Sequence, residues 1–169
     1  AAVHVTVAGT YVLWGRPRAG LPHARTAYQL TAELADIVAQ VRAHGPLAHL
    51  LWLAGHFEEG LQIAEAGLAL ITEHELLDTQ PTKSTYPYIQ CLAVSGICHG
   101  FLGNAAFGFQ QLHQATSLAK HHRQRIPQAL AHWGMALLHA LQGEISLSQQ
   151  EADNGLYVMQ EIGATEDNP

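Results

Sequence analysis

The sequence repeats itself four times, and this repetition constrains the fold more than any other feature of the chain. Each copy carries an anchor glycine, and successive anchors are 40, 48 and 40 residues apart. A period of roughly 20–50 residues is typical of repeat proteins, in which each unit buries its apolar face against its neighbours. The chain is therefore predicted to form an array of similar units. The four anchors are Gly15, Gly55, Gly103 and Gly143.

Small residues recur in register with these anchors, which predicts closely packed helix pairs. A glycine just past a helix closes its C-terminus in the left-handed conformation, and small side chains let two helix backbones approach. We therefore place each anchor in the turn of a helix–turn–helix unit. The packing positions five residues after the anchors are Gly20, Gly60, Gly108 and Ser148, and those seven before them are Ala8, Ala48, Gly96 and Ala136.

The second copy, LAGHFEEGLQIAEAGLAL, resembles the core of the tetratricopeptide repeat (TPR). Phe57 stands in the aromatic position of that motif, and Gly60, Gly67 and Leu68 stand in its small and apolar positions. The period here is longer than the family's, which is about 34 residues. The resemblance implies an all-α fold, an α-α superhelix of about four TPR-like repeats. The other copies replace the aromatic residue with Pro17, Ala105 and Ile145.

Long, degenerate repeats of this kind resemble the helical arrays that follow ATPase modules in bacterial signalling proteins. Such proteins include predicted-ATPase/class III adenylate cyclase fusions and large LuxR-type transcriptional regulators. The first group is similar to the segment AGTYVLWGRPRAGLPHARTAYQLTAEL. The resemblance implies a non-enzymatic protein-interaction or ligand-sensing module of a cytoplasmic, multidomain signalling or transcription regulator. Its partners would be a protein or peptide, other domains of the parent chain, or a small apolar ligand.

We expect a single helical domain over residues 1–162, with repeats over about 1–35, 36–75, 88–122 and 126–162. The second helix of the first repeat is expected to continue through LTAELADIVAQVRAH until Gly45 and Pro46 stop it. The polar stretch LDTQPTKSTYP at 77–87 is predicted to be a loop, and residues 163–169 a disordered tail. Because the chain begins on Ala and ends in TEDNP, we interpret it as a segment of a longer protein.

Composition excludes several classes of function. Eight Lys and Arg against 14 Asp and Glu give a formal charge of −6, which excludes a nucleic-acid-binding domain that works through a basic surface. No apolar run of about 18 residues is present, so no membrane span is expected. Cys91 and Cys98, seven positions apart on one helix, would be about 10 Å apart, too far for a disulfide. Free thiols suit a reducing cytoplasm.

Histidine is the one residue type in clear excess, with 12 copies. His132 and His139 are predicted to share a helix face, and His99 could approach from the neighbouring repeat to complete a zinc site. No H-E-x-x-H motif occurs, and the alternative is that these residues fill packing positions. Packed, neutral histidines resist protonation, so mild acid is expected to destabilise the fold.

Motifs for catalysis are not apparent. The chain contains no G-x-S-x-G and no G-x-x-x-x-G-K-[ST]. We therefore expect no enzyme activity, catalytic residue, metal or cofactor, and keep a metal-dependent enzyme built on the histidines as an alternative. A second alternative is a structural oligomerisation module. The last helix carries apolar residues on two faces, so a second copy of the chain or the next repeat of the parent is expected to cover one of them.

In TPR-like arrays the first helix of each pair lines a concave groove, which suggests where a partner would bind. The positions ten, six and three before each anchor should face this groove, and here they are mainly apolar. They lack the Lys, Arg and Asn set that clamps a peptide carboxylate. A groove for a helix, a peptide or a small ligand is predicted, unless these residues pack against neighbouring repeats. The candidate binding residues are His49, Trp52, Ile97, Trp133 and Leu137.

Overall fold

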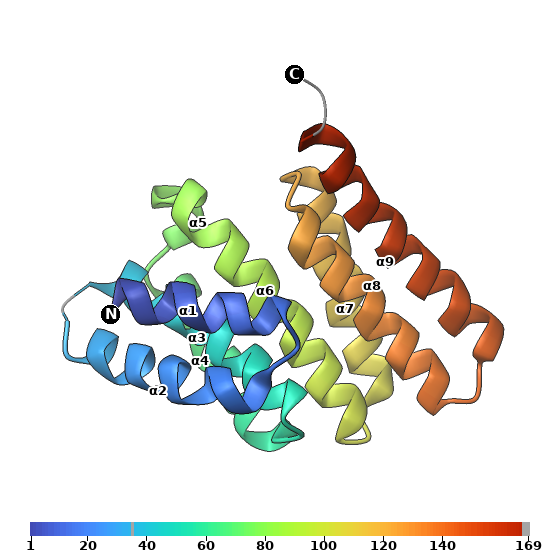
Figure 1. Ribbon diagram of the computed structural model, residues 1–169, viewed down its shortest axis with the longest axis horizontal. Coiled ribbons are helices and arrows are strands. Elements are labelled where there is room, and N and C mark those ends of the chain that lie inside the picture. The colour runs from blue at the N-terminus through green and yellow to red at the C-terminus, as the bar shows by residue number, and fades with distance from the viewer. Residues whose placement is uncertain (35, 167–169) are drawn as a thin grey trace.

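A computed structural model of the chain describes residues 1–34 and 36–166 (Figure 1). Over these residues the backbone forms nine helices and no strand. The chain is therefore all-α. In order, the helices are α1 (Ala2–Leu13), α2 (Pro17–Ala32), α3 (Ile37–Leu53), α4 (Phe57–Glu73), α5 (Leu76–Thr79), α6 (Pro81–Phe101), α7 (Ala105–His121), α8 (Arg125–Leu141) and α9 (Ile145–Glu166).

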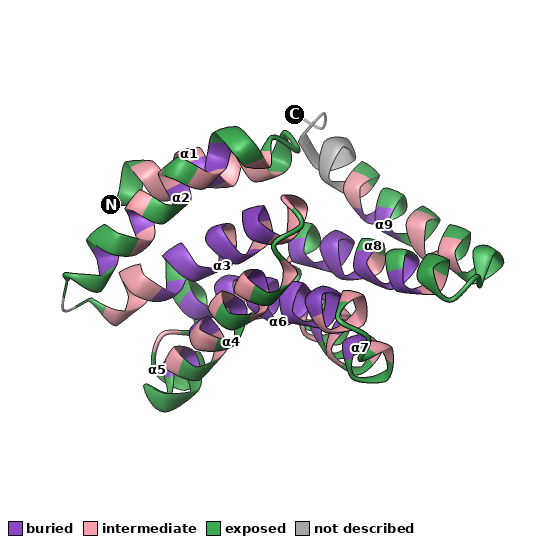
Figure 2. Ribbon diagram, turned by 90° about the horizontal axis from the view of Figure 1, so that it is seen from below, coloured by how far each residue is buried: buried purple, intermediate pink, exposed green. Residues whose placement is uncertain are grey.

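The helices pack as four consecutive pairs. The pairs are α1–α2, α3–α4, α6–α7 and α8–α9, and the short α5 lies beside α4 and α6. The second helix of each of the first three pairs also contacts the first helix of the next pair. The first helices α1, α3, α6 and α8 contact one another in succession, and we call them the inner row (Figure 2). No helix in the described part of the chain is both long and apolar enough to span a membrane.

The four anchor glycines end the inner-row helices in the same way. Gly15, Gly55, Gly103 and Gly143 have φ values of 59°, 84°, 93° and 77°, in the left-handed region where a side chain is strained. After each helix, the backbone N–H of the residue following the glycine bonds five residues back, for example Asn104 N–H to His99 O at 2.8 Å. This is the Schellman closure of a helix C-terminus.

The small residues at the packing positions meet in space. A Cβ atom added to Gly108 on α7 would lie 2.6 Å from the carbonyl oxygen of Gly96 on α6. The equivalent contact in the preceding pair joins Gly60 to the carbonyl oxygen of Ala48, where an added Cβ would lie at 3.3 Å. The residues five after and seven before an anchor are therefore opposite each other where these two helix pairs cross. Gly20 is similarly enclosed, whereas Ser148 is partly exposed.

Two sequence predictions about the first half of the chain are wrong. The second helix does not continue to Gly45, because α2 ends at Ala32 and a new helix begins at Ile37. The side chain of Asp36 accepts a hydrogen bond from the backbone N–H of Ala39 at 3.1 Å and so caps this new helix. Gly45 and Pro46 lie inside α3, where Gly45 leaves room for the side chain of Gln90 from α6.

The predicted loop at 77–87 is also helical. It contains α5 and the first turns of α6, with Pro81 in the first turn, where its missing N–H leaves no hydrogen bond unmade. Ser84, Thr85 and Pro87 are buried, so tertiary packing favours a helix that the polar composition argued against. At the other end α9 continues through Glu166, so residues 163–166 of the predicted tail are helical. Residues 167–169 lie outside the described residues.

The main core surrounds α6, the longest helix of the inner row. Ile89, Val94 and Ile97 from this helix are completely buried, and Leu112 from α7 packs with them. Both cysteines of α6 are buried and free. Burial raises the pKa of the Cys91 and Cys98 thiols to about 12, so they remain protonated at neutral pH and serve as packing residues.

Candidate functional site

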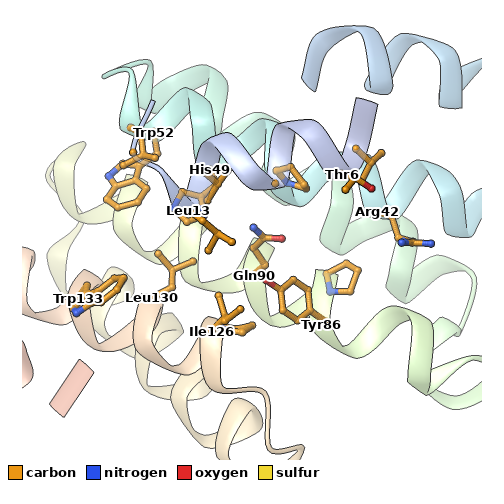
Figure 3. A pocket seen from close by; sticks show the side chains of 18 of the residues that line it. Thr6, Leu13, Arg42, His49, Trp52, Tyr86, Gln90, Ile126, Leu130 and Trp133 are labelled. Atoms are coloured by element: carbon orange, nitrogen blue, oxygen red, sulfur yellow. The ribbon is translucent and has the colours of Figure 1, made fainter. Parts of the chain in front are cut away.

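A cavity of about 810 Å³ opens along the inner row. All four inner-row helices contribute to its wall, and α9 adds Met159. Figure 3 shows side chains from these helices converging on one space. Concave sites of roughly 300–1,000 Å³ with mainly apolar walls are typical of small-molecule binding sites. This inner-row cavity is therefore the candidate functional site.

Helix α1 forms an open wall of this cavity. Val5, Thr6, Gly9, Val12 and Leu13 all line it, and their spacing places them on one helix face with Gly9 at the centre. No atom lies within 4 Å of a Cβ added to Gly9. The missing side chain therefore leaves space in the middle of the wall.

Aromatic side chains gather at one end of the cavity. Trp52 and His49 come from α3, with their ring centroids 5.1 Å apart, and Trp133 comes from α8. Trp133 packs against α9 at Gly155, where an added Cβ would lie 2.5 Å from the indole Nε1. Figure 3 shows both tryptophans at this end. Three of the five predicted binding residues are thus brought together on the cavity wall.

His49 is held in an apolar environment. Its Nδ1 atom is buried and has no hydrogen-bond partner among the described residues. Burial lowers the pKa of this imidazole from 6.5 to about 4, because the charged form loses its hydration. At neutral pH His49 is therefore uncharged and adds a polar but not a cationic group to the cavity.

Polar side chains gather at the opposite end. Arg42 from α3 and Tyr86 from α6 line the cavity there, and Gln90 from α6 lies towards its middle (Figure 3). Lys83, about one helical turn before Tyr86 on α6, also lines the cavity. Burial raises the pKa of the Tyr86 phenol, which keeps it protonated and able to donate a hydrogen bond. This end combines donors and cations, whereas the tryptophan end is apolar.

The other two predicted binding residues do not line the cavity. Ile97 is completely buried, and its Cγ1 would lie 2.7 Å from a Cβ added to Gly134, so it fills the space where α6 crosses α8. Leu137 is 38% exposed on α8, outside the cavity wall. Ile97 is therefore a packing residue between α6 and α8, whereas His49 at the same repeat position of α3 lines the cavity.

The sequence prediction missed the whole polar end of the cavity. The predicted loop at 77–87 contains Lys83 and Tyr86, and the predicted long second helix contains Arg42. The signals that could have placed them were Asp36 as an N-cap and Pro81 as a first-turn proline. With those two helix starts, Arg42 and Lys83 fall on inner-row helices.

The histidines considered for a zinc site are held apart by different carboxylates. His132 Nδ1 lies 2.7 Å from Glu151 Oε2, and His139 Nδ1 lies 2.6 Å from Glu144 Oε2. His99 instead approaches Glu65, with 3.3 Å between Nε2 and Oε1. Within the described residues no group of three or more His, Cys, Asp or Glu is arranged to hold a metal ion.

Comparison with known proteins adds no functional assignment to this geometry. Neither a protein-family model nor a curated protein matches the chain.

Proposed function

We propose that the chain is a TPR-like α-α superhelix that serves as a non-enzymatic ligand- or partner-binding module. Its site is the inner-row cavity, and the observation that supports this most is the cavity's largely apolar wall with tryptophans at one end. The resemblance of the sequence to helical arrays of bacterial regulators favours a role in a cytoplasmic, multidomain signalling or transcription regulator. Its natural occupant would be a small ligand, a peptide, or a segment of a protein partner or of the parent chain.

The position of the cavity suggests how binding would be transmitted. Its wall includes Val5 on the first helix and Met159 on the last, which belong to the first and last helix pairs. An occupant that contacts both pairs would favour the arrangement of the array in which those contacts form. Binding would thereby change how the ends of the array are presented to neighbouring domains.

Filling the cavity from α1 tests this site without removing any packing contact. Gly9→Leu is expected to leave the melting temperature unchanged or higher, because the new side chain enters open space and replaces a helical glycine. The same variant should bind the neutral apolar dye Nile red at least about tenfold more weakly, a difference of about 1.4 kcal/mol. Fluorescence titration of the dye measures this affinity.

Two control variants accompany this titration. Gly9→Ala adds only one carbon and should bind the dye nearly as the original chain does. Trp14→Ala removes a tryptophan that is 64% exposed outside the cavity and should have no effect. If the chain does not bind the dye, or if folded Gly9→Leu binds it with full affinity, the cavity is not the binding site.

Exposed apolar residues on α9 favour oligomerisation as a second candidate function. Ile145 and Leu156 are 66% and 53% exposed and lie on one face of the helix, since eleven residues complete about three turns. A face of this kind suits contact with a second copy of the chain. Sedimentation velocity should then show a dimer that Leu156→Glu converts to a monomer. A monomeric original chain at high concentration would exclude this function.

A further inference from the structure

The charge of the cavity wall is opposite to that of the whole chain. The chain carries a formal charge of −6, yet among the described residues the only Asp, Glu, Lys or Arg side chains on the wall are Arg42 and Lys83. Neither forms an ion pair with another described residue, and both are exposed to solvent. Unpaired cations beside an apolar wall provide an attractive site for an anion.

The two cations lie far from the tryptophans. Arg42 precedes Trp52 by ten residues on α3, which corresponds to roughly 15 Å along the helix axis. Lys83 is one helical turn from Tyr86, and Figure 3 shows Tyr86 at the same end as Arg42. An occupant that contacts both ends must therefore be elongated, with a polar group at one end only.

We propose that the inner-row cavity binds a small anionic amphiphile, with a carboxylate between Arg42 and Lys83 and an aliphatic body that extends towards Trp52 and Trp133. This inference rests on the proposed function, since it names the ligand class of the same site. Arg offers two parallel N–H donors that match a carboxylate, and Lys adds a second positive charge. The Tyr86 phenol is available as a further donor. The volume of about 810 Å³ fits a small molecule of this shape.

Isothermal titration calorimetry with three probes of equal chain length tests the charge requirement. Dodecanoate, dodecanol and dodecyltrimethylammonium share an aliphatic body and differ in the charge of the head group. Dodecanoate is expected to bind at least about tenfold more tightly than either of the other two. The double variant Arg42→Gln/Lys83→Gln should lose this preference, because it removes both charges and leaves the apolar wall intact.

The matched control is the double variant Arg18→Gln/Lys120→Gln. Like the test variant, it removes one Arg and one Lys charge, but from exposed sites outside the cavity. It should therefore keep the full preference for dodecanoate. Gly9→Leu should weaken the binding of dodecanoate, which locates it in the cavity. The preference for dodecanoate and these three responses of the variants together support the proposal.

Three results would overturn it: equal affinity for the anionic and cationic probes, undiminished binding of dodecanoate to folded Arg42→Gln/Lys83→Gln, or no binding of dodecanoate to the original chain. Nile red separates these failures from failure of the proposed function, since the dye is neutral. If Gly9→Leu still weakens binding of the dye, the cavity remains a binding site and only the anionic ligand class is wrong. If neither probe binds, both proposals fail.

Discussion

Gly108→Ala is expected to lower the free energy of unfolding by about 3 kcal/mol, a large loss for the addition of one carbon atom. The new Cβ would lie 2.6 Å from the carbonyl oxygen of Gly96 and 3.1 Å from the backbone nitrogen of Gly100. These are backbone atoms, so no side chain can rotate to make room. Helices α6 and α7 would have to separate at the centre of the main core.

Thermal unfolding followed by circular dichroism measures this effect. For a chain of this size, 3 kcal/mol corresponds to a fall in melting temperature of roughly 6–12 °C. Gly60→Ala is the matched control, because it stands at the equivalent repeat position but its Cβ would lie 3.3 Å from the Ala48 oxygen. Its effect should stay within about 1 kcal/mol, since the gain in helix propensity offsets a mild contact.

Gly9→Ala completes the series. Gly9 lies in a helix with open space around its Cβ position, so alanine should raise the free energy of unfolding by about 0.5–1 kcal/mol. The expected order of melting temperatures is Gly9→Ala highest, Gly60→Ala near the original chain, and Gly108→Ala lowest. A melting temperature for Gly108→Ala equal to that of Gly60→Ala would show that α6 and α7 do not approach as closely as described.

Mild acid is expected to destabilise the fold through His49, and this is the second large effect. The pKa of His49 is about 4 in the folded chain and 6.5 when unfolded, so the unfolded state binds the proton more readily. The stabilisation is complete above pH of about 6.5 and is lost as the pH falls towards 4. The total loss is about 3 kcal/mol, of which about 2 kcal/mol should appear between pH 7 and pH 5.

His44 should add to this loss in the same direction. Burial lowers the pKa of His44, although the hydrogen bond between its Nδ1 and the Gln40 carbonyl oxygen, at 2.7 Å, partly opposes the shift. Proton uptake on unfolding therefore also begins as the pH falls below 6.5 for this residue. Both histidines lie in α3.

Urea denaturation at pH 7 and pH 5 measures the acid effect. His49→Gln cannot take up a proton, so the difference in unfolding free energy between the two pH values should shrink by about 2 kcal/mol. His44→Gln should shrink it as well, and the double variant should have the weakest pH dependence of the four chains. An unchanged pH dependence in His49→Gln would mean that its imidazole is hydrated in the folded protein.

Local rules allowed much of the helix pairing to be predicted from residues alone. A residue in the left-handed conformation after a helix is strained unless it is glycine, so Gly15, Gly55, Gly103 and Gly143 revealed the turns. The same rules failed where tertiary packing opposed composition. The polar stretch before Tyr88 is helical because tertiary packing buries Ser84, Thr85 and Pro87 at the start of α6. Gly45 is part of α3 because its missing side chain accommodates Gln90.

The repeat alone could therefore reveal where the chain turns and which small residues bring helices together, because both depend on contacts close to the backbone. It could not reveal which inner-row positions stay open. His49 and Ile97 stand at the same repeat position, yet His49 lines the cavity and Ile97 is buried between α6 and α8. That difference, and the presence of Arg42 from α3 and Lys83 from α6 on the wall of one cavity, depend on how neighbouring pairs stack. Such stacking joins residues about forty positions apart and leaves no local mark in the sequence.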